Sequence, residues 1–225
     1  MNFDKNKFWD NKIIDWEDKR YSEFEVNSNS SSNSGLSLGS SLQFRLKKSA
    51  EILKPYLADK GLLELGCGSG LLVKALSNSK MRQYTGIDWA SPAISKARDE
   101  FKNNPPLSPV EFMTGNFMEM DFPDFDVVVA LGVLDWLELE EIRFLFSNIK
   151  PKSFLFSISE KRFSLKQWLH SIYVFFAYGW RSKGYVPRYY TVDRIVRIAN
   201  DCGYKAVKIF RDPKLSFGTF LYQLD

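Results

Sequence analysis

The sequence contains few of the residues that build metal sites and disulfide frameworks. Its 225 residues include two cysteines, Cys67 and Cys202, and a single histidine, His170. Neither cysteine has a partner at the spacing typical of a metal site, and nothing indicates a secreted disulfide framework. We therefore expect no bound metal and take the cytoplasm as the default compartment.

Long apolar runs and a strong excess of one charge are also missing. Residues 168–180 are apolar nearly all round but fall well short of the ~20 residues that span a bilayer. Residues 1–20 alternate charges with aromatic residues, so we expect no signal peptide. The formal net charge of +4 permits attraction to anionic partners but does not by itself indicate a nucleic-acid binder.

The length fits one domain with elaborations. Residues 1–41 read as an N-terminal aromatic strap or lid, and their Ser/Asn run at 27–34 reads as a flexible linker. We expect the domain itself to cover residues 42–225, with an aromatic and basic insert at about 161–190.

One stretch carries the strongest pattern in the chain. It reads as a short buried strand that breaks into a glycine loop and enters a helix at Leu71. Alternate glycines supply positive φ and let a backbone pass close to a ligand, and the following helix offers N–H groups to an anion. The residues of this stretch are Leu62, Leu63, Glu64, Leu65, Gly66, Cys67, Gly68, Ser69 and Gly70.

The spacing separates this loop from two relatives. A dinucleotide loop has the pattern G-x-G-x-x-G, and here Gly70 comes one residue too early. A P-loop ends in Gly-Lys-Ser/Thr, whereas Leu71 and Leu72 follow Gly70. What remains is an acidic residue, one spacer and three alternate glycines.

Two later strands place further side chains at the same edge of the predicted sheet. Residues 83–88 end in Asp88, about 20 residues past the glycine loop, which is the spacing at which a carboxylate meets ribose hydroxyls. Trp89 follows directly and can lie against an adenine face. The apolar run at 125–132 leads into Asp135.

Together these stretches resemble the class I methyltransferases, which use S-adenosylmethionine. The glycine loop resembles motif I of that family, and residues 133–137 resemble motif IV, where the cofactor methyl and the substrate meet. The resemblance is good over roughly residues 42–160, whereas the remainder of the chain shares only the order of its elements with the family.

The resemblance implies S-adenosyl-L-methionine as cofactor. It places Glu64 at the methionine end, Asp88 at the ribose, and Asn116 with Phe117 at the adenine. Asn116 stands where the family more often has Asp, and its side-chain oxygen can accept from the adenine amino group. The implied cofactor-binding residues are Glu64, Gly66, Cys67, Gly68, Gly70, Asp88, Trp89, Asn116, Phe117 and Leu131.

The alternation of strands and helices predicts an α/β fold with a parallel sheet and helices on both faces. Expected strands are 62–66, 83–88, 110–115, 126–132 and 153–159, and expected helices are 70–79, 91–103, 138–149 and 191–202. Two more strands, 204–211 and 217–224, fit the family's closing hairpin. The resemblance thus implies a Rossmann-like, doubly wound, mostly parallel seven-stranded sheet with a C-terminal antiparallel hairpin strand.

Three residues are candidates for the chemistry. His170 lies in the insert and is the natural candidate for a general base, the alternative being a packed histidine with no chemical role. Asp135 and Glu160 follow the fourth and fifth expected strands, so either could orient the substrate or assist His170.

The insert allows three interpretations. Its aromatic residues could wall the substrate pocket as a lid, insert into an anionic lipid surface, or form a dimer interface. The first interpretation, which we favour here, predicts an acceptor that is at least partly apolar or lipid-linked. The oligomeric state stays open.

We therefore expect methyl transfer to a small-molecule acceptor, by O-methylation of a hydroxyl or carboxyl on a metabolite, sugar or lipid-linked group. A non-catalytic S-adenosylmethionine-binding scaffold and an RNA methyltransferase are the alternatives. DNA is not an expected partner, because residues 131–134 lack the Asn-Pro-Pro-Tyr type motif of amino-group DNA methylation. The expected location is the cytoplasm, with possible peripheral membrane contact through 163–190.

Overall fold

The computed structural model describes residues 4–21, 38–120, 125–148, 153–162, 164–176, 182 and 185–225. The predicted linker at 27–34 and residues 177–181 of the insert lie outside these ranges. No helix in the described ranges is long and apolar enough to cross a membrane.

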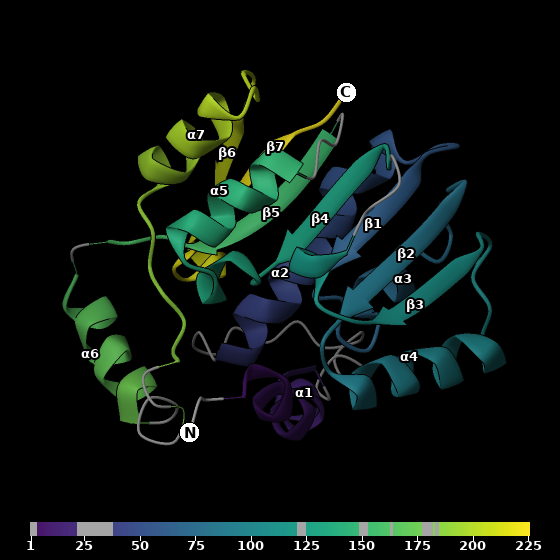
Figure 1. The fold of residues 1–225 in the computed structure, drawn as a ribbon, viewed down its shortest axis with the longest axis horizontal. Helices are drawn as coiled ribbons and strands as arrows, with labels where there is room; N and C mark the ends of the chain where they lie inside the picture. The colour runs from purple at the N-terminus through teal and green to yellow at the C-terminus, as the bar shows by residue number, and fades with distance from the viewer. Residues whose placement is uncertain are drawn as a thin grey trace.

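Seven strands form one sheet in the order β3-β2-β1-β4-β5-β7-β6 (Figure 1). β1 to β5 pair in parallel, whereas β7 lies antiparallel to both β5 and β6. This arrangement confirms the predicted mostly parallel sheet with one antiparallel strand. The strands are β1 Gly61–Leu65, β2 Gln83–Asp88, β3 Val110–Thr114, β4 Val127–Leu131, β5 Ser153–Ser159, β6 Lys208–Arg211 and β7 Gly218–Gln223.

The bounds of β2, β5 and the helix after β2 are those predicted, and most other elements differ by one residue at an end, but two elements differ by more. The helix after the glycine loop ends at Ala75, where Ser77 N and Ser79 N bond to the carbonyls of Lys74 and Leu76, three residues back, instead of continuing the α-helical pattern. β6 starts at Lys208, because Tyr204 turns inward and packs on Phe154 at a centroid distance of 5.2 Å. The helices are α1 Lys5–Tyr21, α2 Leu38–Leu53, α3 Leu71–Ala75, α4 Ser91–Asn103, α5 Leu139–Asn148, α6 Leu165–Val174 and α7 Val192–Asp201.

The third difference concerns the domain boundary expected between residues 41 and 42. α2 already begins at Leu38, so this boundary falls within a helix. Ser41 and Leu46 of this helix are buried, and α2 packs beside α3. The helix therefore belongs to the domain as a unit.

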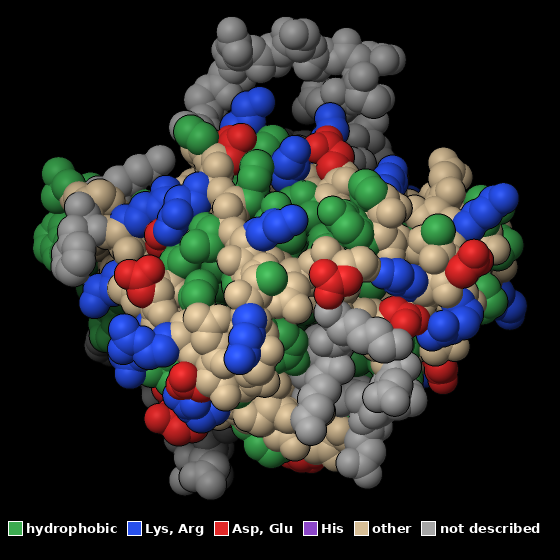
Figure 2. Space-filling view, turned by 90° about the horizontal axis from the view of Figure 1, so that it is seen from above, with side chains coloured by type: hydrophobic (Ala, Val, Ile, Leu, Met, Phe, Trp, Pro, Cys, Tyr) green, Lys and Arg blue, Asp and Glu red, His purple; other side chains and the backbone are tan. Residues whose placement is uncertain are grey.

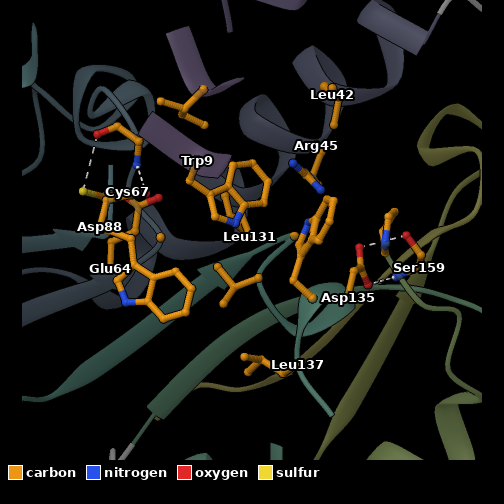
Figure 3. A pocket seen from close by; sticks show the side chains of 18 of the residues that line it. Trp9, Leu42, Arg45, Glu64, Cys67, Asp88, Leu131, Asp135, Leu137 and Ser159 are labelled. Atoms are coloured by element: carbon orange, nitrogen blue, oxygen red, sulfur yellow. Dashed lines mark hydrogen bonds between the residues drawn. The ribbon is translucent and has the colours of Figure 1, made fainter. Parts of the chain in front are cut away.

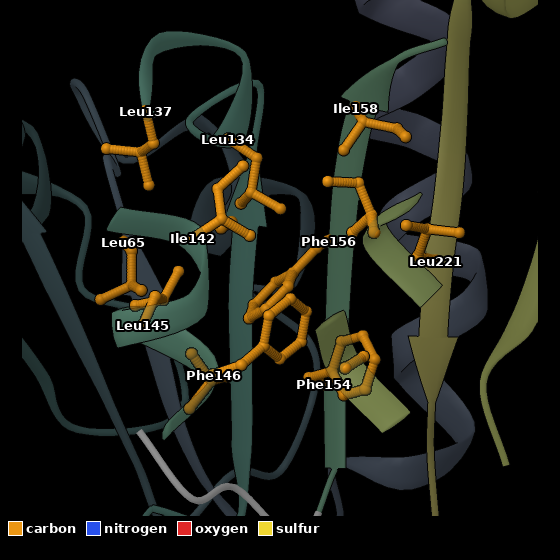
Figure 4. Packing of buried hydrophobic residues seen from close by; sticks show 14 of the residues in the cluster. Leu65, Leu134, Leu137, Ile142, Leu145, Phe146, Phe154, Phe156, Ile158 and Leu221 are labelled. Atoms are coloured by element: carbon orange, nitrogen blue, oxygen red, sulfur yellow. The ribbon is translucent and has the colours of Figure 1, made fainter. Parts of the chain in front are cut away.

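Helices cover both faces of the sheet because each central strand is apolar on both sides. Along β4, Val128 and Ala130 face the core under α5 and α7, whereas Val127 and Val129 face the core under α2, α3 and α4. Such a continuous apolar run is typical of a buried parallel strand. Figure 4 shows Phe146 of α5 directed at the aromatic residues of β5 on the first face.

Two helices lie outside these layers. α1 crosses below the carboxyl ends of the strands, where Ile13 forms a small separate cluster with Ala90 and Ala93 (Figure 1). α6 stands away from the sheet beyond β5 (Figure 1). These two helices border the edge of the sheet at which the predicted site residues end.

Candidate active site

A single cavity of about 700 Å³ opens at the carboxyl ends of β1, β2 and β4, between the sheet and α1 and α2. This is the place where open α/β sheets bind ligands, and the volume suits a cofactor or substrate. Eleven of the thirteen predicted site residues line it: Glu64, Gly66, Cys67, Gly68, Asp88, Trp89, Asn116, Phe117, Leu131, Asp135 and His170. Gly70 and Glu160 do not.

The glycine loop forms the floor of the cavity at its β1 end. Gly66 has a φ of 67°, and a Cβ there would lie 2.4 Å from Val133 Cγ2. Gly70 has a φ of 79° and precedes α3, but a Cβ on it would meet Phe101 at 2.8 Å and Phe112 at 3.0 Å. Gly70 thus supplies the left-handed turn and allows the close approach of two core rings, and its predicted contact with the cofactor stays a prediction.

Two strand-end carboxylates face the cavity beside this loop. Glu64 of β1 is 3% exposed and accepts a 2.5 Å hydrogen bond from Tyr84 Oη, and burial raises its pKa to about 8. Asp88 of β2 accepts from the backbone N–H groups of Gly68 and Ala90, each at 2.9 Å. Burial raises the pKa of Asp88, against the effect of these backbone hydrogen bonds.

A third carboxylate comes from α1 and was not predicted. Glu17 is 5% exposed, its Oε1 accepts from Ser69 N at 3.0 Å, and burial raises its pKa. Its Oε2 and the Trp89 Nε1–H are the two buried side-chain polar atoms without a hydrogen-bond partner among the described residues. Both residues line the cavity, so each has a polar atom to offer a ligand. Nothing in the sequence separates Glu17 from the other charged residues of that helix.

Asn116 already has local partners. Its Oδ1 accepts from Met118 N at 3.0 Å and its Nδ2 donates to Glu119 Oε1 at 2.6 Å. The side chain thereby caps the short 3₁₀ turn Phe117–Glu119. A carbonyl oxygen has a second lone pair, so the predicted contact with adenine stays a prediction.

Asp135 lies at the opposite end of the cavity, beyond Leu131 (Figure 3). Asp135 is buried, with Oδ1 accepting from Ser159 N at 2.6 Å and Oδ2 from Ser159 Oγ at 2.9 Å. Burial raises its pKa, and the hydrogen bonds from Ser159 oppose that effect. His170 Nδ1 is hydrogen-bonded to Tyr189 Oη, and its ring lies 5.5 Å from that of Phe217.

The hydrogen bonds and ion pairs of Glu160 explain why its side chain does not line the cavity. It pairs with Arg211 at 2.8 Å and Arg162 at 3.0 Å and accepts from Thr219 Oγ1 at 2.8 Å. The hydrogen bonds from Arg211 lower its pKa most, to about 2. This carboxylate ties the end of β5 to β6 and β7, which is a structural role.

An aromatic and basic wall completes the cavity on the α1 and α2 side. Trp9 packs on Trp136 at a centroid distance of 4.8 Å, and its Nε1 donates to Tyr185 Oη at 3.3 Å. Arg45 of α2 approaches Gly132, where a Cβ would lie 2.8 Å from the guanidinium. Trp9 belongs to the segment predicted as a strap or lid, whereas the sequence carried no signal that singled out Arg45.

The predicted wall of insert aromatics is partly wrong. His170, Tyr185 and Pro187 line the cavity, but Trp168 is 60% and Phe176 67% exposed. Trp180 lies outside the described residues. Nor does the described part of the chain hold a group of three or more His, Cys, Asp or Glu side chains able to bind a metal ion.

Comparison with known proteins relates this geometry to a family. Residues 62–151 match the family model described as a methyltransferase domain. The mitochondrial ubiquinone biosynthesis O-methyltransferase of Saccharomyces cerevisiae is 23% identical over 136 residues, which span 59% of this chain and only 44% of that protein.

Solved structures give the same fold over more of the chain. Magnesium protoporphyrin IX methyltransferase from Synechocystis PCC 6803, with S-adenosylhomocysteine (SAH) bound, superposes with a TM-score of 0.70 at 17% identity and covers 96% of both chains. A mycolic acid cyclopropane synthase complexed with SAH has a TM-score of 0.62 at 15% identity, covering 75% of this chain and 62% of that one. Residues 62–151 therefore match a methyltransferase domain by sequence, and the chain has the Rossmann-like fold of solved methyltransferases.

Proposed function

We propose that this protein binds S-adenosylmethionine in the cavity and catalyses methyl transfer to a small-molecule acceptor in the cytoplasm. The acceptor atom is a hydroxyl or carboxyl oxygen on a metabolite, sugar or lipid-linked group. The carrying observation is that one cavity joins Glu64 and Asp88 at one end to Asp135 at the other and is also lined by His170. Figure 3 shows Glu64 and Asp88 on one side of Leu131 and Asp135 on the other.

The residues at the first end fit the cofactor. Asp88 would accept from the ribose hydroxyls, and Glu64 would face the amino group of the methionine part. Trp89 has a buried Nε1–H without a partner and a ring that lines the cavity, so it can both stack and donate. Arg45 lines the cavity nearer Asp135, whose pKa its charge lowers, and would offer a cation to the carboxylate of the methionine part.

The residues at the second end act on the acceptor. The cofactor supplies an activated methyl group for an in-line displacement, and the protein supplies orientation and a dry pocket. An oxygen acceptor must lose its proton, and His170 is the candidate to accept it. Tyr189 Oη is hydrogen-bonded to Nδ1 of the imidazole and so fixes the orientation of the ring. Asp135 accepts hydrogen bonds from Ser159, which tie the turn that carries Asp135 to β5.

Calorimetry with SAH tests the cofactor assignment. We expect micromolar binding by the wild type and about 10- to 150-fold weaker binding by Asp88→Asn, because a hydrogen bond to a charged group contributes about 1.5–3 kcal/mol. Asp99→Asn, on the exposed side of α4, is the matched control and should bind normally. Absence of heat with SAH, alongside binding of a nicotinamide dinucleotide, would contradict the proposal.

Transfer of labelled methyl groups to fractionated extracts tests catalysis. We expect label in a small-molecule or lipid fraction. SAH binding without any transferred label would favour a non-catalytic scaffold. Label in RNA would favour an RNA methyltransferase, although the face in Figure 2 shows Lys and Arg side chains interspersed with Asp and Glu instead of a continuous basic stripe.

A further inference from the structure

α6 presents an apolar stripe to solvent. Nine large hydrophobic side chains are exposed among the described residues, and six of them lie within this one helix and the two residues after it. Their spacing of three and four residues places them on one side of a helix. This α6 apolar surface consists of Leu165 (73% exposed), Trp168 (60%), Leu169 (54%), Ile172 (38%), Phe175 (53%) and Phe176 (67%).

The polar side chains of α6 hold the helix to the domain, which reverses the usual orientation of a surface helix. Gln167 is 5% exposed, donates to Glu160 O at 2.8 Å and accepts from Arg162 N at 2.5 Å. Ser164 caps the helix, and His170 bonds to Tyr189. With its polar residues directed inward, the apolar stripe is left for an external partner.

Cations gather beside the stripe. A groove of about 740 Å³ runs between α6 and residues 188–190 and is lined by Lys161, Arg162 and Arg188, with no Asp or Glu among its described lining residues. Arg162 also pairs with Glu160, and Arg188 with Glu138, neither of which lines the groove. Trp168 belongs both to this groove and to the α6 apolar surface.

We propose that the α6 apolar surface and this groove dock the protein on an anionic lipid bilayer. Aliphatic and aromatic side chains would enter the acyl boundary while the three cations meet the lipid phosphates, which is the arrangement of interfacial helices. A second copy of the chain fits less well. A symmetric pairing through this surface would bring like charges of the two grooves together.

Docking would also bring the active-site cavity to the membrane. His170 lies on the inward side of α6 and lines that cavity, so the acceptor end would open near the lipid surface. The acceptor class that follows is a lipid-linked or membrane-dissolved hydroxyl compound. This last step rests on the proposed function, whereas the docking surface does not.

Vesicle co-sedimentation without cofactor or acceptor tests the docking. The wild-type protein should bind vesicles of phosphatidylglycerol and phosphatidylcholine more tightly than phosphatidylcholine alone, and salt should weaken that binding. The double variant Leu169→Gln with Phe176→Gln should lose at least tenfold in partitioning, because it removes two inserted apolar side chains. The matched control, Leu107→Gln with Ile209→Gln, changes two exposed apolar residues elsewhere and should bind as the wild type does.

Three outcomes would overturn the docking proposal. The first is no binding of the wild type to either vesicle, and the second is an equal loss in both double variants. The third is a wild-type dimer that the Leu169→Gln, Phe176→Gln variant converts to monomer in sedimentation velocity, with no vesicle binding, which would assign the surface to a second copy. SAH calorimetry on the same variant reports separately on the cofactor site, so a failure of docking is not confused with a failure of the proposed function.

Discussion

At the scale of single residues, three carboxylates set the electrostatics of the cavity. Glu17, Glu64 and Asp88 all face it, and burial raises the pKa of each. Through like-charge repulsion, Asp88 also raises the pKa of Glu17 and of Glu64, and Glu17 raises the pKa of Glu64. A cationic ligand would relieve this repulsion, which makes the cavity selective for positive charge.

The raised pKa of Glu64 predicts how stability varies with pH in the protein without cofactor. Between its ordinary value of 4.5 and its folded value of about 8, the folded state keeps a proton that the unfolded state releases. The contribution of Glu64 to the free energy of unfolding should therefore be largest below pH 4.5 and fall as pH rises through this window, with a slope of up to about 1.4 kcal/mol per pH unit. Glu64→Gln should remove this part of the slope in urea unfolding between pH 5 and 8.

Glu111→Gln is the control for the pH series. Glu111 is exposed on β3, so this variant should keep the wild-type slope. An unchanged slope in Glu64→Gln would show that Glu64 ionises in the folded state near its ordinary pKa.

The role of His170 also belongs at this scale. If it accepts the proton of the acceptor, His170→Ala should lower turnover by about 100-fold or more, with SAH affinity nearly unchanged. Turnover is measured with labelled cofactor on the fraction that takes up label. Tyr189→Phe removes the hydrogen bond to Nδ1 but keeps the imidazole, so its loss should be smaller.

A packing role for His170 predicts a different pattern. His170→Ala would then lower the free energy of unfolding, through lost contacts with Phe217, and would leave turnover per folded molecule unchanged.

At the scale of elements, α1 acts as a strap across the cavity. Glu17 bonds Ser69 N, Asp10 accepts from Ser91 N at 3.0 Å, and Asp18 pairs with Lys96 at 2.7 Å. None of the α1 side chains that the structure describes belongs to the two main core clusters. Its attachment therefore depends on local contacts and can loosen while the domain stays folded.

Ile13→Asp should loosen this strap selectively. Ile13 is buried against Ala90 and Ala93, and a carboxylate there would lose its hydration without a partner. We expect SAH to dissociate at least tenfold faster in stopped-flow measurements, with a much smaller change in the unfolding of the domain. Asp15→Asn, at an exposed position of the same helix, should dissociate SAH at the wild-type rate. Equal rates in both variants would contradict the strap's role in cofactor retention.

At the scale of the whole molecule, the sheet and the site's location followed from the sequence. Strand periodicity and the glycine loop predicted the order of elements, because parallel strands buried on both faces need continuous apolar runs. The family resemblance supplied the seventh strand and its antiparallel direction. The position of the cavity followed, since all the strand-end residues meet at one edge.

The errors share a physical origin. Composition shows that the insert is aromatic, but it does not show that Gln167 would face the domain and turn Trp168 to solvent. Likewise Glu160 follows a strand toward the site, yet Arg211, distant in sequence, holds it elsewhere. Long-range partners decide where such side chains point, and a local pattern contains no information about them.

The position of β7 has a consequence for how the molecule is made. β7 lies between β5 and β6, so neither can complete its pairing before residues 218–223 emerge from the ribosome. Phe220 and Leu221 of β7 also enter the core clusters on opposite faces of the sheet. During synthesis one edge of β5 therefore stays unpaired until β7 has been made. If translation stalls at that stage, chaperones or strands of other chains would bind the nascent chain at this edge.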